Sequence, residues 1–268
     1  MPIAMSYRRF VDSKFNTYEQ ILRLRDLFES ASFFIYNVVL ADYLRNLESS
    51  KYIVKDAGAR RAFNGYSMSK RIGFLEEILN IVQSGENGDD LFIPEILKSD
   101  IVSKLNSLGE FRNYISHTAA ATESRQKKLI DKYQPIVEDI LESLDFLATY
   151  RLVRIPQFKF KDGKLVRTME VYTGVVPTPD EFLIENDNEY IRADADHLIL
   201  LDQDDQFLDL FPIYQLLASD ETHDETHMCF LKQRKAEQKK LTGESVQGAF
   251  EVSLDGYDVF EELQNKIK

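Results

Sequence analysis

Three polar side chains of complementary chemistry lie close together at Arg112, Asn113 and His117, in the segment FRNYISH. Asn113 and His117 are four residues apart and share one face of an α-helix, and the long side chain of Arg112 reaches toward that face. An imidazole that titrates near neutral pH serves as a general acid or base. A guanidinium binds a phosphate through paired hydrogen bonds. Together these residue types suit RNA cleavage without a metal ion, in which the 2′-hydroxyl loses a proton as it attacks phosphorus.

Helices must position this cluster, because the preceding sequence repeats apolar residues with helical spacing. Residues 17–47 carry apolar side chains at i, i+3, i+4 and i+7, which predicts one long core-facing helix or two abutting helices divided at the polar step 29–32. Thr17 and Gln20 predict a capping box at its start. A second helix follows Ser67 and ends at the Gly- and Asp-rich turn at 85–90.

Helical patterns continue on both sides of the cluster. A third apolar stripe runs from Pro94, which suits the first turn of a helix, to Leu108. A fresh helical stretch is expected over 111–118, and the last helix is expected over about 124–150. Pro135 lies inside that last helix and predicts a kink or a restart.

The pattern changes near Arg151, where apolar and polar residues begin to alternate with period two. Asp162 and Gly163 lie between two such runs and predict a β-hairpin. Further short runs surround an Asp-rich turn at 202–205, and the final residues, DGYDVFEELQNKIK, predict an amphipathic helix. Helices followed by strands indicate an α+β protein. We expect an antiparallel helical bundle over 1–150 and an acidic, mostly antiparallel β-rich domain with a terminal helix over 151–268.

Charge is distributed unevenly along the 268 residues, whose formal net charge is −12. Residues 174–268 hold 22 Asp and Glu against 8 Lys and Arg, whereas residues 1–173 hold 23 against 25. The first part is therefore slightly basic and its charge does not exclude RNA as a partner. The sequence lacks an apolar run of roughly 18 residues and the signature of a signal peptide, so we expect a cytoplasmic protein with no membrane partner.

The segment FRNYISH resembles the R-x4-H signature of the HEPN superfamily (higher eukaryotes and prokaryotes nucleotide-binding), which often has a polar residue after the Arg. Arg112, Asn113 and His117 match that pattern. The resemblance covers roughly residues 17–150. It implies a bundle of four to five helices, a homodimer with a composite RNase site, and a place in toxin–antitoxin, CRISPR or phage-defence systems. By this resemblance Arg112, Asn113 and His117 are the catalytic residues.

A looser resemblance covers more of the chain. A helical bundle followed by a small β-rich unit is similar to the layout of bacterial signalling and conflict proteins, in which the bundle need not be a nuclease. The alternative function is therefore a non-catalytic HEPN-like module that binds a protein partner or regulates a defence or signalling complex.

Basic residues around the cluster offer a phosphate-binding surface. They are Lys98, Lys104, Arg125, Lys127, Lys128 and Lys132. An ordinary charged helix face is the competing interpretation.

Other polar clusters have less specific patterns. His223 and His227 have the i, i+4 spacing of metal ligands but no evident third ligand, so a solvated loop is expected there. The acidic turn at 202–205 lacks the Gly and terminal Glu of a calcium loop. Cys229, the single cysteine, is expected to be buried and inert. Neither GxGxxG nor GxxxxGK occurs, and we expect no cofactor and no metal.

Overall fold

The structure, a computed structural model of the chain, describes residues 2–45, 68–84, 91–98, 100–108, 111, 122–155, 158–172, 180–184, 197–218, 226–246 and 251–265. The chain forms two compact units, Pro2–Phe146 and Leu147–Lys266. The expected boundary between residues 150 and 151 lies four residues beyond this division. We call the two units the helical unit and the β unit, and describe each by itself.

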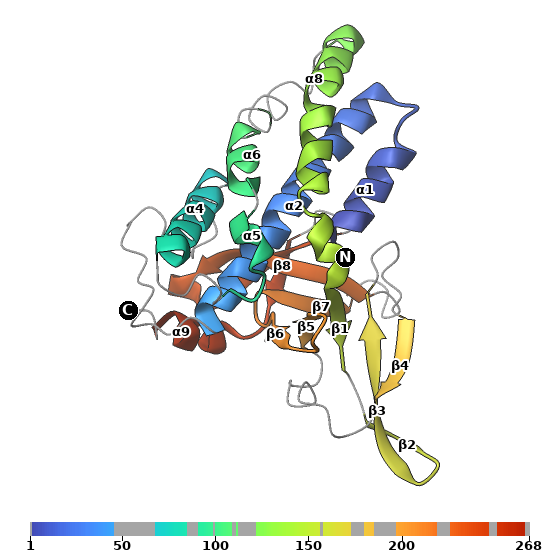
Figure 1. The fold of residues 1–268 in the computed structure, drawn as a ribbon, viewed down its shortest axis with the longest axis vertical. Coiled ribbons are helices and arrows are strands. Elements are labelled where there is room, and N and C mark those ends of the chain that lie inside the picture. The colour runs from blue at the N-terminus through green and yellow to red at the C-terminus, as the bar shows by residue number, and fades with distance from the viewer. Residues whose placement is uncertain are drawn as a thin grey trace. The chain divides into compact units, whose positions relative to one another are not determined.

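The helical unit contains six α-helices among its described residues (Figure 1). They are α1 (Pro2–Asp12), α2 (Thr17–Arg45), α4 (Met68–Ser84), α5 (Glu95–Lys98), α6 (Ile101–Ser107) and α8 (Glu123–Glu142). A 3-10 helix, η2 (Asp145–Thr149), follows α8. The sequence indicated α2 and α4 closely, but not α1.

The long helix α2 forms the centre of the helical unit. Every residue from Phe34 to Leu44 is buried, so this part of the helix is enclosed on all sides. Among the described residues, α2 is the one helix long and apolar enough to cross a membrane, but 83% of its most apolar 18-residue window is buried inside the protein. Such burial is typical of a core helix, and gives no positive sign of a membrane span.

The cap of α2 differs from the expected one. The side-chain Oδ1 of Asn16 accepts a hydrogen bond from the backbone N–H of Glu19 at 3.1 Å. Asn16 therefore satisfies a free amide at the helix start, and the expected capping box of Thr17 and Gln20 is wrong. Asparagine is at least as good a cap as threonine, and here it precedes the first helical residue.

Two other expectations for the helices need correction. The stripe expected from Pro94 to Leu108 forms two short helices, α5 and α6, rather than one. The last helix, α8, continues through Pro135 without a restart but ends at Glu142. Pro135 is exposed, which places its ring on the solvent side of the helix.

The β unit contains two antiparallel sheets. Their strands are β1 (Arg151–Arg154), β2 (Phe158–Lys161), β3 (Lys164–Val171), β4 (Asp180–Ile184), β5 (Leu198–Leu201), β6 (Phe207–Asp209), β7 (Tyr214–Ala218), β8 (Thr226–Lys235), β9 (Lys240–Ser245) and β10 (Glu251–Leu254). The first sheet has the order β2-β3-β1-β5-β6, with β4 also paired to β3, and the second has the order β10-β9-β8-β7. A 3-10 helix, η4 (Ala236–Gln238), joins β8 to β9, and α9 (Tyr257–Asn265) follows β10.

The two expected turns and the terminal helix are confirmed. Asp162 and Gly163 join β2 to β3 with φ angles of 51° and 76°, the left-handed conformation that the Asp-Gly pair favours. In the β5–β6 turn, Asp202 Oδ1 accepts hydrogen bonds from the backbone N–H groups of Asp204 and Gln206 at 2.9 and 2.8 Å. The carboxylate of Asp202 thus stabilises a hairpin turn.

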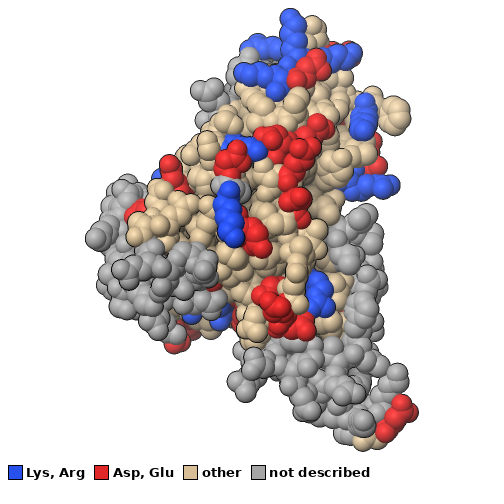
Figure 2. Space-filling model, viewed as in Figure 1, with Lys and Arg blue, Asp and Glu red and all other residues tan. Residues whose placement is uncertain are grey.

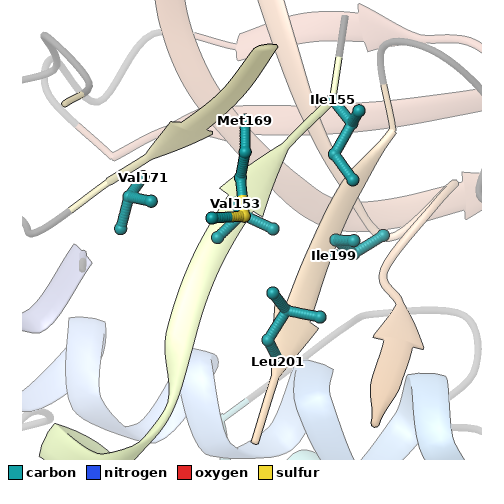
Figure 3. Close-up of a cluster of buried hydrophobic side chains, with 6 residues drawn as sticks. All are labelled: Val153, Ile155, Met169, Val171, Ile199 and Leu201. Carbon is teal, nitrogen blue, oxygen red and sulfur yellow. The ribbon is translucent and has the colours of Figure 1, made fainter. Parts of the chain in front are cut away.

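Apolar side chains with period-two spacing form the core of the first sheet. Val153 pairs directly with Val171 across β1 and β3, and Val153 also lies opposite Ile199 of β5. Figure 3 shows the cluster on three neighbouring strands: Val153, Ile155, Met169, Val171, Ile199 and Leu201. Alternate residues of a strand face the same side of a sheet, which brings these six side chains together.

The protein is therefore a mixed α+β protein, as expected, with its helices mainly in the first unit and its strands in the second. The terminal helix α9 is hydrogen-bonded to β8. Arg234 of β8 donates hydrogen bonds to Gln264, Tyr257 and Glu261 of α9 at 2.6, 2.9 and 2.6 Å.

Candidate nucleic-acid interface

The three candidate catalytic residues, Arg112, Asn113 and His117, lie outside the described residues. Their nearest described neighbours are Phe111 and Thr122. Phe111 is fully buried, and its ring lies 4.3 Å from the ring of Tyr133 in α8, centroid to centroid. Thr122 is the residue immediately before α8. The described residues on either side of the motif therefore both adjoin α8, Phe111 through a ring contact and Thr122 as the residue before the helix.

One side of α8 is buried, and three basic residues lie on the exposed side of its N-terminal half, where Asp131 is also exposed. The buried residues are Gln126, Ile130, Tyr133, Val137 and Ile140. Arg125, Lys128 and Lys132 are exposed and have the spacing i, i+3, i+7, so at 100° per residue they fall within about 60° of one another around the axis. We call these three residues the basic stripe. It extends about 10 Å along the helix, given a rise of 1.5 Å per residue.

Two of the basic residues expected near the motif are engaged in ion pairs instead. The Nζ of Lys104 lies 2.8 Å from Asp139 and 3.2 Å from Asp100, and it donates a hydrogen bond to Ser143 at 2.7 Å. The hydrogen bond to Asp139 is the main reason that the pKa of Lys104 is raised. Lys104 therefore ties α6 to α8, and it is not available as a phosphate ligand.

Lys127 is similarly occupied, because its Nζ lies 2.8 Å from the Oε1 of Glu123, one turn earlier in α8. This hydrogen bond raises the pKa of Lys127 and lowers that of Glu123. Lys128, in contrast, makes no ion pair with any described residue. Lys98 of α5 is exposed.

Lys132 connects the basic stripe to the residue that precedes Arg112. Its ammonium group lies 4.7 Å from the centre of the Tyr133 ring, and the other neighbour of that ring is Phe111. A cation near an aromatic face is attracted by the negative charge of the π system. Phe111, the residue before Arg112, is thus linked to Lys132 of the basic stripe through the ring of Tyr133.

The helical unit also contains buried polar side chains where α2 packs on α4. The guanidinium of Arg71 lies 4.5 Å from the centre of the Phe33 ring and 5.1 Å from that of Tyr36. Burial raises the pKa of Tyr36 to about 12, although the positive charge of Arg71 opposes this effect. Asn37 is completely buried, and neither its Oδ1 nor its Nδ2 has a hydrogen-bond partner within the part of the chain that the structure describes.

The β unit contains a His–Asp pair that the sequence did not indicate. The Nδ1 of His197 lies 2.9 Å from Asp209 Oδ2, and its ring stacks on Phe211 with centroids 4.1 Å apart. Asp209 Oδ1 also accepts the backbone N–H of Phe211 at 2.8 Å. Such a carboxylate can orient an imidazole, but here both contacts also fix the turn after β6. The β5–β6 register, with Ile199 opposite Asp209, would have predicted this diagonal pair.

Two of the remaining candidates, Cys229 and His227, lie in strand β8. Cys229 is buried in β8, as expected, and burial raises the pKa of its thiol to about 12. His227 lies in β8 opposite Leu217, whereas His223 lies outside the described residues. Within the described ranges, no group of three or more His, Cys, Asp or Glu side chains is arranged to hold a metal ion.

Comparison with known proteins gives no relative for this chain. No family model, no curated protein and no solved structure matches it.

Proposed function

We propose that the protein is a metal-independent endoribonuclease of the HEPN type. The observation that supports this most strongly is the position of the basic stripe. Arg125, Lys128 and Lys132 lie on the helix to which both described neighbours of the R-x4-H motif are attached. A nuclease needs cations that hold phosphates next to the group that moves protons, and in this proposal the basic stripe fills that role.

In the proposed reaction, the 2′-oxygen of a ribose forms a bond to the adjacent phosphorus while the bond from phosphorus to the 5′-oxygen breaks. His117 accepts the 2′-hydroxyl proton or delivers a proton to the leaving 5′-oxygen. Arg112 stabilises the negative charge that grows on the phosphate, and Asn113 orients the imidazole or the phosphate. In a homodimer, two copies of the motif would supply the acid and the base separately.

The proposed setting is the bacterial cytoplasm, in a defence or toxin–antitoxin-like system. The resemblance of FRNYISH to the HEPN signature supports this setting, together with the α+β architecture and the burial of α2. A protein partner in that system would act on the nuclease or be regulated by it.

Cleavage of labelled RNA in the presence of EDTA tests the proposal. We expect His117→Ala to slow cleavage by about 10²- to 10⁴-fold, the usual contribution of a general acid or base. Arg112→Ala should slow it by about 10²- to 10³-fold, as expected for the loss of a group that stabilises transition-state charge.

Matched controls come from the β unit. His197→Ala and Arg151→Ala remove the same side-chain types from that unit, where they contact Asp209 and Asp205. Both should cleave at the wild-type rate. Equal loss in the controls, or cleavage by wild type only after magnesium is added, would contradict the proposed function.

A further inference from the structure

Two exposed aromatic side chains, Phe15 and Tyr18, lie at the turn between α1 and α2, and a third, Tyr7, lies within α1. Phe15 is 102% exposed, and Tyr7 and Tyr18 are 44% and 43% exposed. Among the described residues, the only other large hydrophobic side chain that is exposed to this extent is Val259. Exposed apolar groups clustered in this way indicate a binding surface more often than single scattered ones do.

The turn that carries these rings is held by a dense set of hydrogen bonds. The hydroxyl of Ser13 donates to the carbonyl of Phe10 at 2.7 Å, and Asn16 caps α2 through its side chain. The backbone N–H of Gln20 donates to the carbonyl of Asn16 at 2.8 Å. Phe10 is 2% exposed and anchors α1 in the core. Phe15 is therefore presented to solvent by a well-anchored hairpin of two helices.

This turn lies at a positively charged end of the helical unit. The N-terminal ends of α2 and α8 lie at the same end of the helical unit as the turn (Figure 1), and Figure 2 shows Lys and Arg gathered over the end of α8, with Asp and Glu among them. Residues 7–18 and 122–132 together hold seven Lys and Arg against three Asp and Glu, in a chain of net charge −12. The N-termini of α2 and α8 add partial positive charge to this region, and the C-terminus of α1 adds partial negative charge at the turn.

We infer that the α1–α2 turn binds unpaired bases of a single-stranded RNA. Phe15 and Tyr18 stack on the bases, while the basic stripe and Lys14 hold the phosphates. Aromatic side chains interleaved with cations are the usual surface for single strands, because every base has a π face and every linkage has a negative charge. Binding of an uncharged protein surface would account for the exposed rings, but it would not account for the Lys and Arg residues near them.

This inference rests on the proposed function and specifies its substrate class as single-stranded RNA. A duplex keeps its bases stacked inside, so it offers phosphates to the basic stripe but no base to Phe15. The turn would thereby let the protein distinguish loops and unpaired ends from double-stranded regions.

The absence of Trp from the chain provides a direct test. Phe15→Trp introduces a single tryptophan at the fully exposed position, made in a His117→Ala background so that RNA is not cut. We expect oligouridylate to quench its fluorescence, because the base stacks on the indole. An RNA duplex and inorganic polyphosphate should leave the fluorescence unchanged, and quenching by polyphosphate alone would overturn the inference.

Affinity measurements provide the second arm. In the His117→Ala background, Phe15→Ala should weaken binding of oligouridylate by about 5- to 150-fold, the usual loss for one stacked base. Val259→Ala, the matched removal of an exposed apolar side chain from α9 in the β unit, should not change it. Equal affinity of the Phe15→Ala and Phe15 proteins would overturn the inference, as would Phe15-dependent binding to anionic lipid vesicles without binding to RNA.

The two proposals fail in different ways. If the wild type cleaves RNA in EDTA and cleavage does not depend on Phe15, the proposed nuclease activity is supported and the proposed stacking site is contradicted. If oligouridylate binds in a Phe15-dependent manner and the wild type does not cleave RNA, the stacking site is supported and the proposed nuclease activity is contradicted.

Discussion

Removal of the basic stripe should change how RNA binding depends on salt. Each phosphate that a protein neutralises on a single strand contributes about 0.7 to the slope of log affinity against log salt concentration. Arg125, Lys128 and Lys132 are three exposed cations on one face of α8. Their simultaneous replacement by alanine should therefore reduce the magnitude of the slope by about 2.

This change in slope is large enough to measure. A fourfold increase in salt, from about 50 to about 200 mM, should weaken RNA binding by wild type about 20-fold more than binding by the triple variant. The assay is titration of a labelled oligouridylate at several salt concentrations, in the His117→Ala background. Since all three side chains are exposed, thermal unfolding should show stability changed by less than about 0.5 kcal/mol per residue.

A charge-matched control separates local contacts from the general field of the protein. Lys232→Ala, Lys235→Ala and Lys240→Ala together remove the same formal charge from the β unit, where Lys232 and Lys235 pair with Glu244 and Glu251. The proposal assigns no phosphate contact to these three lysines, so this variant should keep the wild-type slope. Identical slopes for wild type and the stripe variant would refute the assignment of phosphate contacts to α8.

Three further predictions concern stability and reactivity. Asn37→Leu should raise the free energy of unfolding by about 1–3 kcal/mol in urea titrations, because it removes a buried amide without a hydrogen-bond partner among the described residues; a loss of stability would show that this amide makes a favourable contact. Cys229 should not react with a thiol reagent at pH 8 in the native protein and should react fully in denaturant, because burial raises its pKa to about 12; rapid native reaction would contradict its burial. Tyr36, whose pKa burial raises to about 12, releases its proton in the unfolded chain first, near pH 10. Unfolding free energy should therefore fall between pH 10 and 12 by up to about 1.4 kcal/mol per pH unit more in wild type than in Tyr36→Phe; parallel pH curves would refute this.

The elements that the sequence predicted well are those whose signals are local. The apolar repeat of α2 extends over eight turns of helix, and the Asp162–Gly163 pair specifies a tight turn by its backbone preferences. The Asp202 turn and α9 follow the same logic. In each case, neighbouring residues contain the information.

Elements that depend on distant contacts were predicted less well. The helix α1 is only 11 residues long and begins with Pro2, so its sequence alone gives a weak signal, and packing of Phe10 stabilises it. Proline inside α8 is tolerated because its ring lies on the exposed side. The register of β5 against β6 places His197 beside Asp209, and this register depends on contacts between distant residues.

In the candidate site, too, the sequence shows the local features but not those that depend on distant contacts. The sequence identified the basic residues of α8, but spacing alone did not show which are committed to ion pairs. Lys104 and Lys127 bind acidic side chains, one across to α8 and one within it. Lys128 and Lys132 lie on the exposed face of α8 together with Arg125, which has an interaction partner of its own. The exposure of Phe15 depends on how α1 packs against α2, which no local pattern in residues 13–16 reveals.

The chemical identity of the RNA ends after incubation in EDTA tests the central claim most directly. Attack by the 2′-oxygen leaves a 2′,3′-cyclic phosphate on one product and a 5′-hydroxyl on the other, whereas attack by water or a metal-bound hydroxide does not. We predict these two termini with the wild-type protein, and their formation about 10²-fold or more slowly with Arg112→Ala or His117→Ala. Products that end in a 3′-hydroxyl and a 5′-phosphate, or cyclic phosphate that forms at the wild-type rate in both variants, would contradict the account.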